Sequence, residues 1–238
     1  MCCDHGPRLS KAVAAMNYDK NNNIVTLTFD DGKANVVGPE FLDTINAGLD
    51  RAEAEKAGAV ILCGREGMFS GGFDLAEFQK GPEAGLAMVQ RGFELLIRLY
   101  SFPLPLVAAC TGHGVAMGAF MIMACDTRIG CQGNFKMSLP ETAIGMQLPP
   151  LLVELATSRI SIRHITRVVL QSEAYAPTAA VDAGFIDEVV EADQLMARAM
   201  EAAEQLSQLP QAQYAENKLS VRARHLQVMK DSLAQMTT

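Results

Sequence analysis

Apolar residues along the chain fall into short continuous runs and into stretches with helical spacing. Two runs of five residues, 59–63 (AVILC) and 106–110 (LVAAC), contain no charged side chain. Runs of this length and composition are typical of strands that are buried on both faces. Residues 24–29 also have strand composition and lead into a turn at Asp30.

Helical spacing follows these runs. In residues 39–54 the apolar side chains recur every three or four positions, which predicts an amphipathic helix, and residues 85–100 show the same spacing. Residues 117–125 are apolar throughout and predict a buried helix. Further helices are expected at 162–170, 178–183, 193–208 and 211–235, and short strands or extended segments at 126–129, 135–137 and 185–190.

Strands alternating with helices, and then helices alone, predict an α/β core with a helical C-terminal appendage. We place the core at residues 1–190 and the C-terminal region at 191–238. A chain of 238 residues, 49% hydrophobic and 20% charged, is long enough to bury a single large core.

Charge and residue usage narrow the function classes. The net charge of -7 argues against nucleic-acid binding. No apolar run approaches the length of a membrane-spanning helix, and residues 1–7 lack the apolar run of an export signal. The six cysteines form no C-x-x-C pair, and the four histidines are far apart in sequence. We therefore expect free thiols, a cytoplasmic location and no metal site.

Two glycine-rich junctions between a strand and a helix are the first candidates for chemistry. They are residues 69–75 (FSGGFDL) and 112–119 (GHGVAMGA). Glycine lets a ligand approach the backbone closely, and the first N–H groups of a helix have no partner within it. Facing each other, the two junctions could each offer one N–H to an oxyanion. Taken singly, each is more simply a tight turn.

Glu141 is the third candidate. It follows a proline in an otherwise apolar stretch, LPETAIGM. Apolar surroundings desolvate a carboxylate and raise its pKa toward the range useful for proton transfer. Without further information, a glutamate at a helix start that simply faces water is the better interpretation.

Taken together and in order, these segments resemble the crotonase superfamily, the enoyl-CoA hydratase/isomerase family. The resemblance extends from about residue 18 to the C-terminal helices. Its motifs are the F-[SA]-x-G-x-D-[LI] loop at 69–75, a strand, glycine-rich turn and helix ending in Cys-Asp at 107–126, Pro-Glu at 140–141, and a closing A-x-x-x-G-[LF]-[VI]-D-x-V element at 180–190.

The resemblance implies a spiral of ββα units with a helical C-terminal oligomerisation region, and an acyl-CoA thioester as substrate with no other cofactor. It implies that the N–H groups of Phe73, after Gly72, and of Met117, before Gly118, hold an enolate oxyanion. Residues expected at the CoA moiety are Ala34, Ser70, Gly71, Asp74 and Leu75. Lys33 is a candidate for a CoA phosphate or equally a solvated turn lysine, and Lys218 and Arg222 are further candidate cations.

One departure from the family pattern bears on the reaction. Family hydratases use two glutamates, and here Phe120 occupies one of those positions while Glu141 occupies the other. A single carboxylate suits a proton shuttle that moves a 3-enoyl-CoA double bond to C2. The alternatives are a weak hydratase, a CoA-thioester hydrolase, and an acyl-CoA-binding protein without activity.

The C-terminal helices also bear on assembly. Their apolar stripes must be buried somewhere. Together with the resemblance, the stripes predict a homotrimer or a hexamer. From the net charge and the absence of a long apolar run, we expect neither a nucleic acid nor a membrane as partner. The stripe residues are Leu195, Met196, Met200, Leu206, Leu219, Leu226 and Met229.

Overall fold

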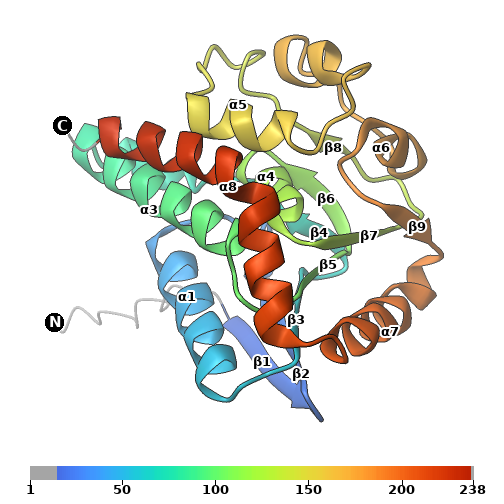
Figure 1. Ribbon diagram of the computed structural model, residues 1–238. Coiled ribbons are helices and arrows are strands. Elements are labelled where there is room, and N and C mark those ends of the chain that lie inside the picture. Colours follow the sequence, from blue (N-terminus) through green and yellow to red (C-terminus); the bar gives the residue numbers. More distant parts are fainter. Residues whose placement is uncertain (1–14, 237–238) are drawn as a thin grey trace, which may run out of the picture.

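The computed structural model describes residues 15–236 and contains two sheets, with helices packed around them (Figure 1). Part of the argument for a cytoplasmic location depends on residues 1–7, which include Cys2 and Cys3. These residues lie outside the described part of the chain. The larger sheet has the order β1-β2-β3-β5-β7-β9, and its pairs are parallel except for β1 with β2. Its strands are β1 Ala15–Asn21, β2 Ile24–Asp30, β3 Ala59–Cys63, β5 Leu106–Cys110, β7 Thr127–Cys131 and β9 Glu188–Val190. The smaller, parallel sheet is β4 Gly67–Ser70, β6 Gly112–Val115 and β8 Met137–Ser138.

A repeated ββα unit generates both sheets. One strand of each unit joins the larger sheet, the next joins the smaller sheet, and a helix or helix pair returns the chain. The units are β3–β4 with α2 Leu75–Gln79 and α3 Pro82–Tyr100, β5–β6 with α4 Met117–Ala124, and β7–β8 with α5 Pro150–Thr157. The predicted spiral is thereby confirmed. Before these units, β1–β2 is followed by α1 Pro39–Ala54, and after them come α6 Pro177–Ala183, α7 Leu195–Ser207 and α8 Gln211–Met236.

The central strands are buried on both faces, as their uninterrupted apolar runs predict. In β3, Val60 and Leu62 face the main core, which contains buried residues of α1, α3 and α4. Ala59 and Ile61, which alternate with them, face a second core that α7 covers with Leu195 and small alanines. This alternation follows from the two-residue period of a strand.

Most helix and strand bounds match the predictions, and the glycine-rich segments account for the main differences. Segments 68–70 and 112–114, interpreted as loops and turns, are strands of the smaller sheet. A Cβ on Gly112 would overlap the backbone of Gly67, so these strands pair only because glycine leaves room. Strand β1 and helix α5 were not predicted, and of the helix expected over 162–170 only a π-helical turn at Thr166–Leu170 forms.

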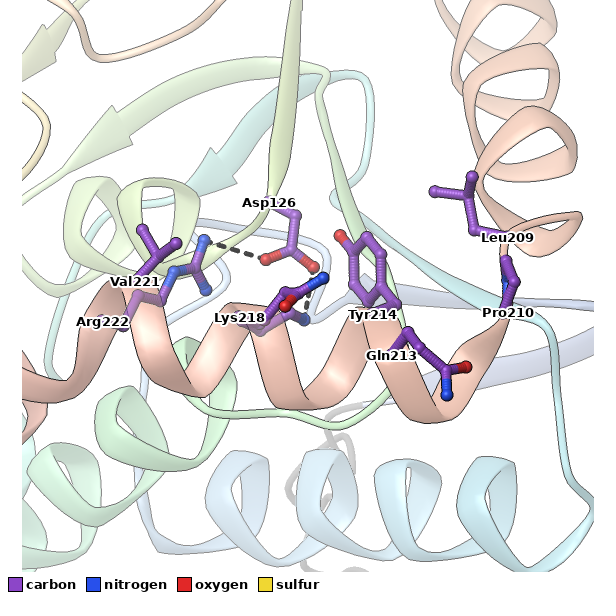
Figure 2. A pocket seen from close by; sticks show the side chains of 9 residues that line it. Asp126, Leu209, Pro210, Gln213, Tyr214, Lys218, Val221 and Arg222 are labelled. Carbon is purple, nitrogen blue, oxygen red and sulfur yellow. Dashed lines mark hydrogen bonds and ion pairs between the residues drawn. The ribbon is translucent and has the colours of Figure 1, made fainter.

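A buried ion cluster fastens α8 to the core (Figure 2). Asp126, which directly precedes β7, accepts from Lys218 Nζ at 2.6 Å through Oδ2 and pairs with Arg222 at 2.9 Å through Oδ1. Lys218 Nζ also donates to the carbonyls of Phe102 and Leu104, at 2.7 and 2.9 Å. Both cations lie on successive turns of α8 and point toward Asp126. Both cations are therefore paired with a carboxylate of this chain, and their contact with a CoA phosphate stays a prediction.

The chain itself buries much of the apolar stripe on its last two helices. Leu195, Leu226 and Met229 are buried in its own cores. Leu219 and Met196 remain partly exposed, at 45% and 38%. Burial of the stripes thus argues less strongly for assembly than the sequence pattern did, and the homotrimer or hexamer stays a prediction.

The first testable prediction concerns the ion cluster. Replacing Asp126 by Asn leaves two buried cations without a counter-charge, and we expect the free energy of unfolding to fall by about 3–5 kcal/mol. Urea denaturation followed by circular dichroism measures this change. The matched control is Asp43→Asn, because Asp43 is 73% exposed and pairs with Arg91 on the surface. Equal effects of the two substitutions would contradict the role given to the cluster.

Candidate active site

A cavity of about 660 Å³ lies where the two glycine-rich junctions meet α3, α5 and the end of α8. Its walls are mainly apolar. Among the described residues that line it, Asp74 and Glu141 carry the only ionisable side chains. The lining consists of Ala34, Val36, Gly71, Phe73, Asp74, Leu75, Phe78, Val89, Phe93, Val115, Ala116, Met117, Phe120, Pro140, Glu141, Ile144, Met146, Gln147, Pro149, Leu152 and Met236.

Backbone hydrogen bonds hold the first junction against the segment that leads from β2 to α1. Val37 N donates to Gly72 O at 2.8 Å, and Asp74 N donates to Val37 O at 3.2 Å. This is the pattern of a parallel bridge between Val37 and Phe73. In such a bridge the N–H of the central residue points away from its partner strand. The Phe73 N–H is therefore directed to the side opposite Val37.

The second junction carries an unusual backbone angle. Ala116, the N-cap of α4, has φ 51° and ψ −124°. A positive φ is unfavourable for alanine, and such strain persists only where surrounding contacts enforce it. Here Ala116 N donates to Ser138 O at 3.0 Å, and Phe120 N donates to Ala116 O at 3.1 Å. Met117 then begins the helix, where an N–H has no partner within the helix.

The two junctions are in direct contact. A Cβ on Gly72 would lie 3.0 Å from the Ala116 Cβ and 3.6 Å from the Met117 nitrogen. A Cβ on Gly118 would overlap the Ser70 carbonyl. Because Gly72 also has φ +103°, only glycine suits that position. The amides of Phe73 and Met117 are thus on neighbouring segments at one cavity, an arrangement suited to holding an oxyanion.

Glu141 is a buried carboxyl group without a counter-ion. Its side chain belongs to a residue only 7% exposed, and its Oε2 has no hydrogen-bond partner among the described residues. Desolvation raises its pKa to about 7, with a smaller opposing effect from its own backbone N–H. Two hydrogen bonds hold the loop that contains Glu141. Within the loop, Met146 N donates to Glu141 O at 2.8 Å, and Thr142 Oγ1 donates to Val169 O at 2.9 Å. At neutral pH such a carboxyl group both accepts and returns protons.

The other acid of the cavity has a structural role. Asp74 caps α2, and its Oδ1 accepts from Ala76 N at 2.9 Å. Phe120 is 1% exposed and lines the same cavity, on α4 after Met117. Its ring can neither hold nor ionise a water molecule. Glu141 is therefore the only carboxyl group of the described lining that is not committed to a cap.

The structure brings some of the predicted site residues to the cavity and not others. Those that line it are Ala34, Gly71, Phe73, Asp74, Leu75, Met117 and Glu141. Gly72 and Gly118 support the lining from behind through close backbone packing. Ser70 is fully buried, and its Oγ donates to Asn35 O at 2.7 Å. Its side chain therefore does not line the cavity, in contrast to the prediction that it contacts the CoA moiety. Lys33 is exposed on a turn outside the lining.

Several residues that shape the cavity gave no sequence signal. Ala116 adopts a positive φ angle, which alanine rarely does, and nothing in the sequence indicates that Asn35 does so too. Phe93 and Met236 lie on amphipathic helices and resemble ordinary core positions. In the described part of the chain, no cluster of histidine, cysteine or acidic side chains suits a metal ion, and no helix is long and apolar enough to cross a membrane.

Comparison with known proteins relates the chain to one enzyme family. Over residues 19–237 the chain matches the family described as enoyl-CoA hydratase/isomerase. An enoyl-CoA hydratase/isomerase family protein from Pseudomonas syringae is 36% identical, with a TM-score of 0.90 over 92% of this chain and 95% of that one. A probable enoyl-CoA hydratase from Mycobacterium tuberculosis is 34% identical, with a TM-score of 0.90 over 93% and 94%. Rat mitochondrial enoyl-CoA delta isomerase 1 is 28% identical over 82% of this chain and 69% of its own.

A second testable prediction follows from the burial of Glu141. Its folded-state pKa of about 7 exceeds the ordinary 4.5, so the folded protein binds this proton more tightly than the unfolded chain does. That contribution to stability is complete below about pH 4.5 and is lost as the pH rises to about 7. Relative to Glu141→Gln, the wild type should therefore lose roughly 3 kcal/mol across this window.

Urea denaturation of both proteins at several pH values measures the difference. The exposed Glu216→Gln serves as control, and its profile should run parallel to that of the wild type. A Glu141→Gln profile that is also parallel to the wild type would show that burial does not perturb this carboxyl group.

Proposed function

Since the chain belongs to the enoyl-CoA hydratase/isomerase family, we propose that it moves the double bond of a 3-enoyl-CoA to C2 with Glu141 as its only general base. The observation that carries this proposal is that, among the described residues lining an apolar cavity, one carboxyl group is not committed to a helix cap. Glu141 is buried there without a counter-ion, and Phe120, which the family resemblance places where hydratases have their second glutamate, lines the same cavity. A metal ion or redox cofactor has no part in the proposed reaction.

The reaction begins with a proton transfer. The ionised Glu141 removes a proton from C2, and the electron pair of the broken C–H bond enters the conjugated system of the thioester and the C3–C4 double bond. The thioester oxygen then carries the negative charge. The N–H groups of Phe73 and Met117 are the proposed donors to this oxygen, and losing one such donor typically costs about 10²–10³ in rate.

The protonated Glu141 completes the reaction by returning the proton at C4, so that the double bond finishes between C2 and C3. One group can do both steps because its pKa lies near 7. Apolar walls support the cycle, since they exclude the water that would otherwise exchange with the proton or add to the product.

The rat relative, named as a delta isomerase, supports this proposal. The Mycobacterium tuberculosis relative is named a probable enoyl-CoA hydratase with one structure and an enoyl-CoA isomerase with another. Hydration of a 2-enoyl-CoA is the second candidate, because one of these two names is a hydratase. Hydration requires the positioning of one water molecule, for which a pair of carboxylates is suited. Product analysis separates the two, because isomerisation creates a conjugated thioester and hydration removes one. Thioester hydrolysis would release free CoA, and binding without any product would indicate an acyl-CoA-binding protein.

The third prediction concerns the base. Glu141→Gln preserves the shape of the side chain and removes its ability to accept a proton. We expect the isomerisation rate to fall by about 10²–10⁴, with the affinity for 3-enoyl-CoA changed little. The rate is followed by the absorbance of the conjugated product, and the affinity by calorimetry. Glu216→Gln is the control, and a Glu141→Gln protein with the wild-type rate would refute the proposed mechanism.

The fourth prediction concerns the missing second carboxylate. Phe120→Glu introduces an acid into the same cavity, and we expect it to add water to a 2-enoyl-CoA at a measurable rate while the wild type forms little 3-hydroxyacyl-CoA. Chromatography of the CoA thioesters measures the product. Phe120→Leu is the apolar control, and circular dichroism confirms that both variants fold. Hydration by the wild type as fast as its isomerisation would favour the hydratase instead.

A further inference from the structure

Asn35 is a buried polar residue that the proposed reaction does not use. It is 1% exposed and has φ 49°, in the left-handed region. Asparagine tolerates this conformation better than most residues, at a cost that surrounding contacts must offset. The segment that contains it leads from β2 to α1 and lines the cavity through its neighbours Ala34 and Val36.

The side chain of Asn35 joins the two sheets. Its Nδ2 lies 3.0 Å from Phe29 O, in β2, and 3.1 Å from both Met68 O and Phe69 O, in β4. The amide has two hydrogens for these three acceptors, so they share them. Its Oδ1 accepts from Asp31 N at 3.0 Å. The side chain thus fixes where the smaller sheet, and the junction after β4, stands relative to the larger sheet.

The backbone of the same segment continues this contact along the junction. Asn35 O accepts from Ser70 Oγ at 2.7 Å, and Gly72 N donates to that same Oγ at 3.3 Å. Ala34 O accepts from Gly71 N at 2.8 Å. The left-handed conformation of Asn35 accompanies this arrangement, in which its carbonyl and its side chain both contact the chain between Met68 and Ser70.

We propose that Asn35 is a positioning residue that sets the orientation of the Phe73 N–H toward the substrate oxygen. The hydrogen bonds just described hold residues 68–72 immediately before that amide. Electrostatic stabilisation depends on donors fixed in advance, since a displaced N–H loses its alignment with the oxyanion. This inference rests on the proposed function, because it assigns a positioning role within that same oxyanion site.

The variant Asn35→Gly tests the proposal with the least backbone strain. Glycine retains access to the left-handed conformation and removes every side-chain hydrogen bond. The matched control is Asn22→Gly, because Asn22 has a similar φ of 52° but is exposed in the turn between β1 and β2. Both substitutions replace an asparagine in the left-handed conformation, but of these two asparagines only Asn35 contacts the junction after β4.

Two readouts separate positioning from a general structural role. The first is the division of the kinetic effect between kcat and KM for 3-enoyl-CoA. The second is the absorbance of bound 4-(dimethylamino)cinnamoyl-CoA, a conjugated thioester whose spectrum moves to longer wavelength when hydrogen bonds polarise its carbonyl oxygen. Loss of stability alone does not change the spectrum of ligand bound to folded protein at saturation.

For Asn35→Gly we expect kcat to fall by about tenfold or more, KM to change by less than about twofold, and the spectral shift to be smaller than that of the wild type. Asn22→Gly should match the wild type in both readouts. If Asn35→Gly does not fold, Ser70→Ala provides the test, because it removes only the Oγ link between Asn35 O and Gly72 N. A smaller loss in both readouts is then expected.

The outcomes distinguish this inference from the proposed function. A wild type that neither isomerises 3-enoyl-CoA nor shifts the spectrum of the bound thioester contradicts the proposed function. A wild type that does both, together with an Asn35→Gly protein (or Ser70→Ala, where that is the folded variant) that retains the full kcat and the full spectral shift, overturns the positioning role of Asn35 alone.

Discussion

The close approach of backbone to backbone between β4 and the β6–α4 junction is the constraint on which the cavity depends. A Cβ at Gly112 would overlap Gly67, and a Cβ at Gly118 would overlap Ser70. The start of α4 therefore lies directly against the chain that leads to Phe73. A larger residue at either glycine separates the two segments, and with them the two amides. The glycines act here through the space that they leave, and at Gly72 through a positive φ as well.

Two buried carboxyl groups of this chain have opposite surroundings. Asp126 is surrounded by Lys218 and Arg222, so its charge is compensated and fastens α8 to the core. The described residues that line the cavity of Glu141 are mainly apolar and include no cation, so burial favours its neutral form and raises its pKa. The charge of Asp126 is compensated within the fold, and the charge of Glu141 is not, so its ionised form costs stability, as the proton-transfer role proposed above requires.

The last two helices pack against different parts of the fold. Among the described helices, α7 is the one that packs on the second face of the sheet, and Ala199, Ala202 and Ala203 allow a close approach. α8 packs against α3 and α5, and its end reaches the cavity through Met236. In Figure 1 the two helices lie along different sides of the molecule. The C-terminal region is therefore part of the core and of the cavity wall as well as a candidate surface for assembly.

The sequence alone determined the elements whose signal is local. Two strands and one helix have the predicted bounds: Ala59–Cys63, Leu106–Cys110 and Pro39–Ala54. A strand buried on both faces appears in the sequence as a continuous apolar run, and a helix buried along one stripe appears as apolar residues at helical spacing. The family motifs in addition selected Phe73, Met117 and Glu141 together, although each segment by itself predicted little. Only the tertiary structure decided that the glycine-rich turns are strands, that Lys218 and Arg222 compensate Asp126, and that Ser70 and Asn35 lie behind the cavity. Pairing between strands, the choice of a charge's partner and a left-handed backbone angle all depend on residues far apart in sequence, and so none of them leaves a periodic pattern along the chain.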